Sequence, residues 1–140
     1  MSETHRPRRR LRSAAALLFG FLAGVVLSLG TDVVLHAIGV FPPLGQPLSD
    51  ALCLLATAYR IPYGVVGSYV AARLAPDRPM QHALVLGVLG LVVSIVGAMV
   101  TWNRGLGPHW YPLALVATAM PCAWAGGRLR VMQLRAGPAL

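Results

Sequence analysis

The sequence predicts an all-α fold: a four-helix transmembrane bundle with both ends of the chain in the cytoplasm. Hydrophobic residues make up 56% of the 140 residues and charged residues only 11%, whereas a soluble domain averages about 25% charged residues. A chain this short cannot bury so much apolar surface away from water, so lipid must be the solvent for much of it. The apolar residues fall into four runs, each with the ~20 residues that cross a bilayer.

Breaks between the apolar runs set the domain boundaries. A basic cytoplasmic leader, residues 1–12, precedes the first span. Prolines and glycines in residues 38–49 end that span and forbid a helix until Pro47, and Ser49 is the expected N-cap of the second. The four-helix domain covers residues 13–130, with spans at about 13–36, 49–72, 80–101 and 109–128, and a cytoplasmic tail follows at 131–140.

The leader and first span are not expected to form a cleaved signal peptide. The apolar run at residues 14–35 exceeds the roughly 7–15 residues of a signal-peptide core, and no A-x-A cleavage site follows it. The leader is expected to be disordered or bound to lipid headgroups.

Arginine placement predicts the orientation of the bundle. Ten arginines lie in the leader, in the turn between the second and third spans, and in the tail, whereas Arg104 stands alone on the other side and Arg60 lies within a span. The positive-inside rule makes the arginine-rich side cytoplasmic, in a bacterial inner membrane. The net charge of +8 is therefore attributed to arginines that set the orientation of the protein and contact anionic lipid at the cytoplasmic face. No nucleic-acid partner is expected. Aromatic residues at the opposite ends of the spans are assigned to an outer interfacial belt: Phe41, Trp102, Trp110 and Tyr111.

The two halves of the chain resemble each other. LCLLATA at residues 52–58 and LALVATA at residues 113–119 share five of seven positions. Two parallel helical-hairpin repeats would produce this pattern, and so would shared apolar composition; both explanations are open. Further matches relate the first span to the third: Gly20, Val25, Val26 and Gly30 with Gly87, Val92, Val93 and Gly97.

Ionisable residues at membrane depth define the candidate site. Asp32 and His36 lie one turn apart near the outer end of the first span. Arg60 lies ~15 Å below the outer start of the second span, at 1.5 Å per residue. A charge at mid-bilayer costs about 2.5–3.5 kcal/mol, and an ion pair with Asp32 would offset part of that cost. Three hydroxyl side chains are expected to fill the other guanidinium donors: Thr57, Tyr59 and Tyr63.

The predicted binding site is an outer-facing polar cluster of Asp32, His36, Tyr59, Arg60 and His109. Its functional interpretation is a small solute or proton pathway. Its structural interpretation is an Asp32–Arg60 ion pair, called the clasp below, that only fixes how the first two helices pack. Open water access to Arg60 favours the pathway, and a closed pair favours the clasp.

No catalytic residue, metal or cofactor is predicted. Asp32, His36 and His109 would offer metal ligands if they converged, but they form no recognised metal motif. A bis-histidine haem is disfavoured because His36 and His82 are expected on opposite sides of the membrane. The sequence has no nucleophile–base pair, phosphate loop or paired carboxylates, so we do not expect an enzyme.

In size and span number the chain resembles the small multidrug transporters and the fluoride channels. It lacks the first-span glutamate of the transporters, and its arginine bias opposes the dual insertion common among fluoride channels. The segments RLAPDRPMQHALVLG and GPHWYPLALVATAMP resemble those of uncharacterised small bacterial four-span inner-membrane proteins, which implies no activity.

The expected function is that of a structural or accessory membrane subunit, whose partners are the bilayer, anionic lipid, and a second copy or another membrane protein. The alternative is a small solute or proton transporter or channel built on Asp32, His36 and Arg60.

Overall fold

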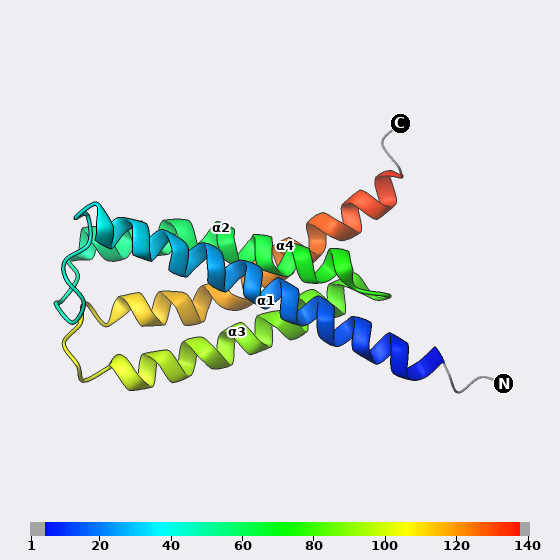
Figure 1. Cartoon of the computed structure of the whole chain (residues 1–140), viewed down its shortest axis with the longest axis horizontal. Helices are drawn as coiled ribbons and strands as arrows, with labels where there is room; N and C mark the ends of the chain where they lie inside the picture. Colours follow the sequence, from blue (N-terminus) through cyan, green and yellow to red (C-terminus); the bar gives the residue numbers. More distant parts are fainter. Residues whose placement is uncertain (1–4, 138–140) are drawn as a thin grey trace.

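The structure, a computed structural model, describes residues 5–137, and this part of the chain forms four α-helices and no strand. The helices are α1 (His5–Ala37), α2 (Asp50–Leu74), α3 (Pro79–Thr101) and α4 (Trp110–Ala136). Figure 1 shows that the α1–α2 and α3–α4 loops lie at one end of the bundle, and that the α2–α3 turn and both termini lie towards the other. The prediction of an all-helical chain with four helices is confirmed.

The boundaries of α2 and α3 lie within two residues of those predicted. The Ser49 Oγ accepts the N–H of Leu52 at 3.4 Å, as expected of an N-cap. Pro79 occupies the first turn of α3, where its missing N–H costs little. Local chemistry therefore fixes the start of both helices.

The first and last helices of the chain, α1 and α4, are longer than predicted. α1 begins at His5 rather than near residue 13, and α4 continues to Ala136 rather than ending near residue 128. The prediction that the leader is disordered is therefore wrong for residues 5–12, which are helical. The tail is also helical, through residue 136. The prediction ended each helix where the apolar residues stopped, but arginine is itself a good helix former. Residues 1–4 of the leader and 138–140 of the tail lie outside the described residues.

Small side chains fill the centre of the bundle and large apolar side chains point outward. The buried hydrophobic residues are mostly alanines and cysteines, among them Ala71, Ala83 and Ala123. By contrast, Val33 is 67% exposed and Met99 is 75% exposed. Soluble bundles bury their large apolar residues, whereas bundles in lipid place small residues between the helices.

Helix α2 packs against all three other helices, α3 packs against α4, and α1 contacts α3 only slightly. Glycines permit the closest approaches. A Cβ on Gly126 of α4 would lie 2.5 Å from the Val65 carbonyl oxygen of α2, and one on Gly20 of α1 would lie 2.7 Å from the Gly67 carbonyl oxygen of α2. Because those atoms belong to the backbone, only glycine allows these crossings.

Two helical segments, Pro7–Ala37 and Pro79–Thr101, are long and apolar enough to cross a membrane. Only a small part of the most apolar stretch of each is buried inside the protein, unlike the core helix of a soluble domain. These two helices support an association with membranes.

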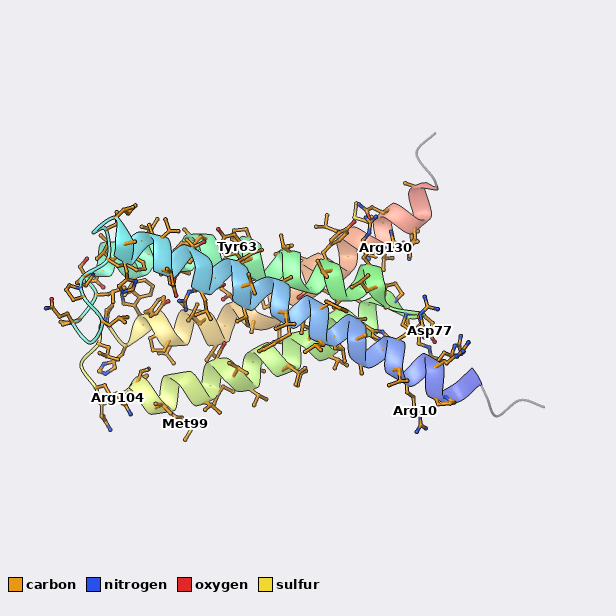
Figure 2. The ribbon with its side chains drawn as sticks, in the orientation of Figure 1. Arg10, Tyr63, Asp77, Met99, Arg104 and Arg130 are labelled. Atoms are coloured by element: carbon orange, nitrogen blue, oxygen red, sulfur yellow. The ribbon has the colours of Figure 1, made fainter. Side chains whose placement is uncertain are left out.

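Arginines gather at the end of the bundle that holds the termini. Figure 2 shows Arg10, Asp77 and Arg130 towards this end and Arg104 at the other. The arginine end is made by side chains of α1, the α2–α3 turn and α4: Arg8, Arg9, Arg10, Arg12, Arg73, Arg78, Arg128, Arg130 and Arg135.

Candidate functional site

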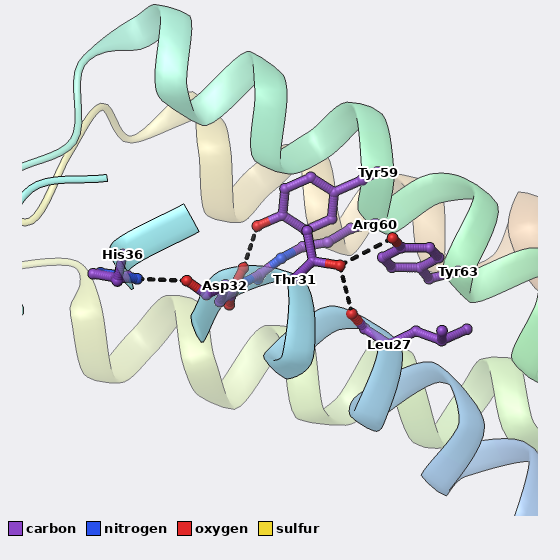
Figure 3. Close-up of polar contacts among 7 residues, drawn as sticks. All are labelled: Leu27, Thr31, Asp32, His36, Tyr59, Arg60 and Tyr63. Carbon is purple, nitrogen blue, oxygen red and sulfur yellow. Dashed lines mark hydrogen bonds and ion pairs between the residues drawn. The ribbon is translucent and has the colours of Figure 1, made fainter. Parts of the chain in front are cut away.

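An ion pair joins α1 to α2. The Arg60 Nη2 donates to the Asp32 Oδ2 at 2.6 Å, and the two side chains are 29% and 19% exposed, respectively. Figure 3 shows them between the two helices. The predicted contact is confirmed, and it forms within a hairpin whose loop, residues 38–49, returns the chain antiparallel to α1.

Two tyrosines complete the surroundings of this pair. The Tyr59 hydroxyl donates to the other carboxylate oxygen of Asp32, Oδ1, so both oxygens have a donor. The Tyr111 ring of α4 lies 5.8 Å from the Arg60 guanidinium carbon, within the range of a cation–π interaction. The pair therefore contacts three helices. We call Asp32, Tyr59, Arg60 and Tyr111 the charged cluster.

The other hydroxyls that were expected to bind Arg60 bind elsewhere. Thr31 Oγ1 donates to the Leu27 carbonyl at 2.8 Å and lies 2.9 Å from the Tyr63 hydroxyl, so Tyr63 is the donor in that second bond (Figure 3). Thr57 donates to the Cys53 carbonyl of its own helix. In the described part of the chain, the buried Arg60 Nε–H is left without an acceptor.

The two predicted histidines do not touch the charged atoms of the pair. The His36 Nδ1 lies 2.7 Å from the Asp32 backbone carbonyl, to which it donates, and its ring meets the edge of Phe41. His109 stacks on Trp102 at 4.4 Å, and its Nε2 donates to the Trp102 carbonyl at 3.0 Å. His36 thus borders the cluster, whereas His109 lies in the α3–α4 loop outside it.

Sequence reasoning missed Tyr111, which was assigned to the interfacial belt. The available signal was its position in the first turn of the fourth predicted helix, at the end of the bundle that holds the α1–α2 and α3–α4 loops. The long side chain of Arg60 lies 5.8 Å from this ring, a reach that depends on how α4 packs against α2.

A cavity of about 390 Å³ lies beside the charged cluster and is lined by residues of all four helices. Among the residues that the structure describes, Arg60 is the only charged one in the lining, and of the α2 lining residues it lies nearest the α1–α2 loop. Six of the lining positions are glycines: Gly20, Gly24, Gly64, Gly67, Gly87 and Gly90. A Cβ at Gly90 would meet nothing within 4 Å, whereas one at Gly20, Gly67 or Gly87 would collide with a neighbouring helix.

Within residues 5–137, no three His, Cys, Asp or Glu side chains lie close enough together to hold a metal ion. Comparisons of the chain with protein-family models, with curated proteins and with solved structures find no match.

Proposed function

We propose that this chain is a four-span integral protein of a bacterial inner membrane, with both termini in the cytoplasm, and that it serves as a structural or accessory membrane subunit. Small residues at the helix interfaces and large apolar residues on the outside support a lipid environment. The collection of arginines at one end supports the orientation.

Helices α2 and α4 are included as spans although they are less apolar than α1 and α3. With 25 and 27 residues, they extend ~38 and ~40 Å at 1.5 Å per residue, more than the ~30 Å of hydrocarbon. Arg60 lowers the apolarity of α2, but Asp32 pairs with it at 2.6 Å, so the two charges enter the membrane as a neutral unit.

The closed geometry of the charged cluster carries the structural interpretation. Both Asp32 oxygens already have donors, and the Arg60 guanidinium is held by Asp32 and by the face of Tyr111. A residue in a proton or solute pathway must exchange partners during transport. In the structural interpretation Arg60 instead keeps its partners, and its contacts with Asp32 and Tyr111 hold α1 and α4 against α2. The basic end then faces anionic lipid or a partner protein.

The cavity beside Arg60 favours a second candidate function, a small solute or proton pathway. The two candidates differ in whether water from the outer side reaches the cluster.

Cysteine accessibility tests the topology and separates the candidates. In a background with Cys53→Ala and Cys122→Ala, single cysteines replace Gly45 in the α1–α2 loop, Asp77 in the α2–α3 turn, and Tyr63 at depth. A membrane-impermeant maleimide is added to intact cells. The proposal expects labelling at position 45, labelling at position 77 only after permeabilisation, and none at position 63.

Labelling of position 77 from outside would contradict the cytoplasmic placement of the α2–α3 turn. Labelling of position 63 from outside would instead favour the pathway. Position 63 is used because replacing Tyr63 leaves the Asp32–Arg60 pair in place.

A further inference from the structure

Hydrogen bonds join α2 to α4 at the arginine end of the bundle. The Arg73 Nη1 donates to the Tyr69 hydroxyl at 3.1 Å, and this hydroxyl donates to the Gln133 Oε1 at 2.8 Å. Arg130 lies one turn before Gln133 on the same side of α4, and its charge acts on the Tyr69 hydroxyl. Arginines from two helices are therefore brought to one tyrosine.

These two arginines keep a positive charge that no carboxylate neutralises. Within residues 5–137, neither Arg73 nor Arg130 forms an ion pair. Asp77, the one acidic residue that the structure describes at this end, lies in the exposed α2–α3 turn. A guanidinium has five N–H groups, and Arg73 uses one of them on Tyr69. The remaining groups suit an anion that accepts forked hydrogen bonds, such as a phosphate.

The hydrogen-bonded residues lie at the depth where the phosphates of a bilayer begin. In the proposed membrane placement, about 20 residues of a helix cross the ~30 Å of hydrocarbon, at 1.5 Å per residue. Counted from the first residue of α2 or of α4, the inner boundary of the hydrocarbon falls near Tyr69 and near Arg130. Arg73, one turn beyond Tyr69, therefore reaches the level of the head groups.

Exposed apolar side chains continue from these residues towards the middle of the membrane. Val66 lies one turn before Tyr69 on α2 and is 42% exposed. Leu129 lies one turn before Gln133 on α4 and is 49% exposed. The helices touch at Gly126, where a Cβ would lie 2.7 Å from the Tyr69 backbone nitrogen, and beyond this contact α4 turns away from the rest of the bundle (Figure 1). The surface is therefore apolar on its membrane side and basic on its cytoplasmic side.

We propose that one anionic phospholipid binds where α2 and α4 separate. Its phosphate oxygens accept N–H groups of Arg73 and Arg130, and one acyl chain lies along Val66 and Leu129. A head group with its own ammonium would be repelled by the arginines, so a phosphate without an attached cation is preferred. The inference deepens the proposed contact with anionic lipid and rests on that proposal. The junction site consists of the side chains of Val66, Tyr69, Arg73, Leu129, Arg130 and Gln133.

Native mass spectrometry of the purified full-length protein in detergent tests the site. The protein is titrated with phosphatidylglycerol, whose head group is anionic and carries no cation, or with phosphatidylcholine that has the same acyl chains. The Kd of the first bound phosphatidylglycerol is expected to be about tenfold lower, because two arginines lie beside its phosphate. The result does not depend on which side of the membrane the site faces, and the cysteine labelling tests that orientation separately.

Two double variants with the same loss of charge show whether the junction site binds the lipid. Arg73→Gln with Arg130→Gln removes the two arginines of the site and is expected to raise the Kd for phosphatidylglycerol about tenfold or more.

The control is Arg128→Gln with Arg135→Gln. Arg128 and Arg130 are two residues apart, which places them on opposite sides of α4, and the Arg128 guanidinium lies over Trp124 at 5.9 Å. Arg135 lies seven residues after Arg128, on the same side. This variant is expected to change the Kd by less than about threefold.

A further arm separates a lipid from a free anion. Potassium phosphate in excess over the lipid is added to the complex with phosphatidylglycerol, and potassium chloride of the same ionic strength is the control. A lipid that is also held by its acyl chain is expected to stay bound equally in both salts. Displacement by phosphate but not by chloride would overturn the lipid and assign the two arginines to a free phosphate ion.

Equal weakening in the two double variants would overturn the junction site, because the lipid would then respond only to the overall charge of the arginine end. Phosphatidylcholine that binds as tightly as phosphatidylglycerol would overturn the recognition of an anionic head group. That comparison uses the unaltered protein, so the test stays decisive if a variant fails to fold.

Discussion

The first helices of the two hairpins, α1 and α3, use two corresponding glycine positions in the same way. Gly20 and Gly87 correspond in the sequence repeat, and both are buried where a Cβ would collide with the partner helix. Gly30 and Gly97 also correspond, and a Cβ on either would meet nothing within 4 Å. The agreement is limited to α1 and α3: under the same correspondence Gly67 of α2 falls on Arg128 of α4, and Gly126 of α4 falls on Val65 of α2. It therefore does not decide between a duplicated hairpin and shared composition.

The hairpins differ at the charged cluster. If the same correspondences are extended, the positions of Asp32, Tyr59 and Arg60 in the first hairpin fall on apolar residues in the second: Met99, Met120 and Pro121. The second hairpin packs through its small residues without an ion pair between these positions. The pair is therefore an addition to a hairpin that already packs, and Tyr111 extends it to the other half of the chain.

Removing one member of the pair should destabilise the protein more than any other single substitution in the two hairpins. Arg60→Gln leaves Asp32 charged and partly buried without its cation, which is expected to lower the free energy of unfolding by about 3–5 kcal/mol. SDS-induced unfolding of the purified protein measures this loss. Arg104→Gln in the exposed α3–α4 loop is the control. A comparable loss in both variants would remove the distinction between the hairpins.

Alanine at the corresponding glycines tests the likeness of the hairpins. Gly20→Ala and Gly87→Ala should each destabilise the protein by about 1–3 kcal/mol through overpacking. The two losses should be of similar size, because the Cβ at Gly20 would lie 2.7 Å from the Gly67 carbonyl oxygen and the Cβ at Gly87 would lie close to the Ala123 Cβ, and neither atom can move without its helix. The same unfolding titration measures both.

The open glycines provide the matched controls. Gly30→Ala and Gly97→Ala should stabilise the helices by about 0.5–1 kcal/mol, because alanine restricts the unfolded chain and fits the available space. Losses of similar size at all four positions would contradict the distinction between the buried glycines and the open ones.

Replacing Tyr111 should have a smaller effect. Tyr111→Leu removes the aromatic face beside Arg60 and is expected to cost about 0.5–2 kcal/mol, whereas Tyr111→Phe keeps the ring and should cost less. In an Arg60→Gln background the difference between the Leu and Phe variants should shrink. If it does not, the ring acts by packing alone.

His109 should matter least. Its ring contacts Trp102 and lies outside the charged cluster, so His109→Gln should change stability by no more than about 0.5 kcal/mol, as for most surface substitutions. Thermal unfolding in detergent is sufficient to compare it with the unaltered protein. A loss of stability as large as that of Arg60→Gln would show that His109 takes part in the charged cluster.

The sequence predicted the four helices and the Asp32–Arg60 contact because both follow from strong local rules. Proline, glycine and the Ser49 cap mark the helix ends, and an arginine at depth requires an anion. Other features depend on the three-dimensional arrangement of the helices. The reach of Tyr111 into the cluster, the bond of Tyr63 to Thr31, and the cavity all require knowing which helix faces which. The helical ends at residues 5–12 and 129–136 were missed because a helix can continue through arginine-rich sequence beyond its apolar part.

The central claim, that the Asp32–Arg60 pair clasps α1 to α2, is tested most directly by a double-mutant cycle. Asp32→Asn, Arg60→Gln and the double variant are purified, and their unfolding free energies are measured under the same conditions. The claim predicts that the double variant is more stable than the worse single variant, because no unpaired charge remains, and that the coupling lies within about 0.5–3 kcal/mol. A double variant no more stable than the worse single one would contradict it.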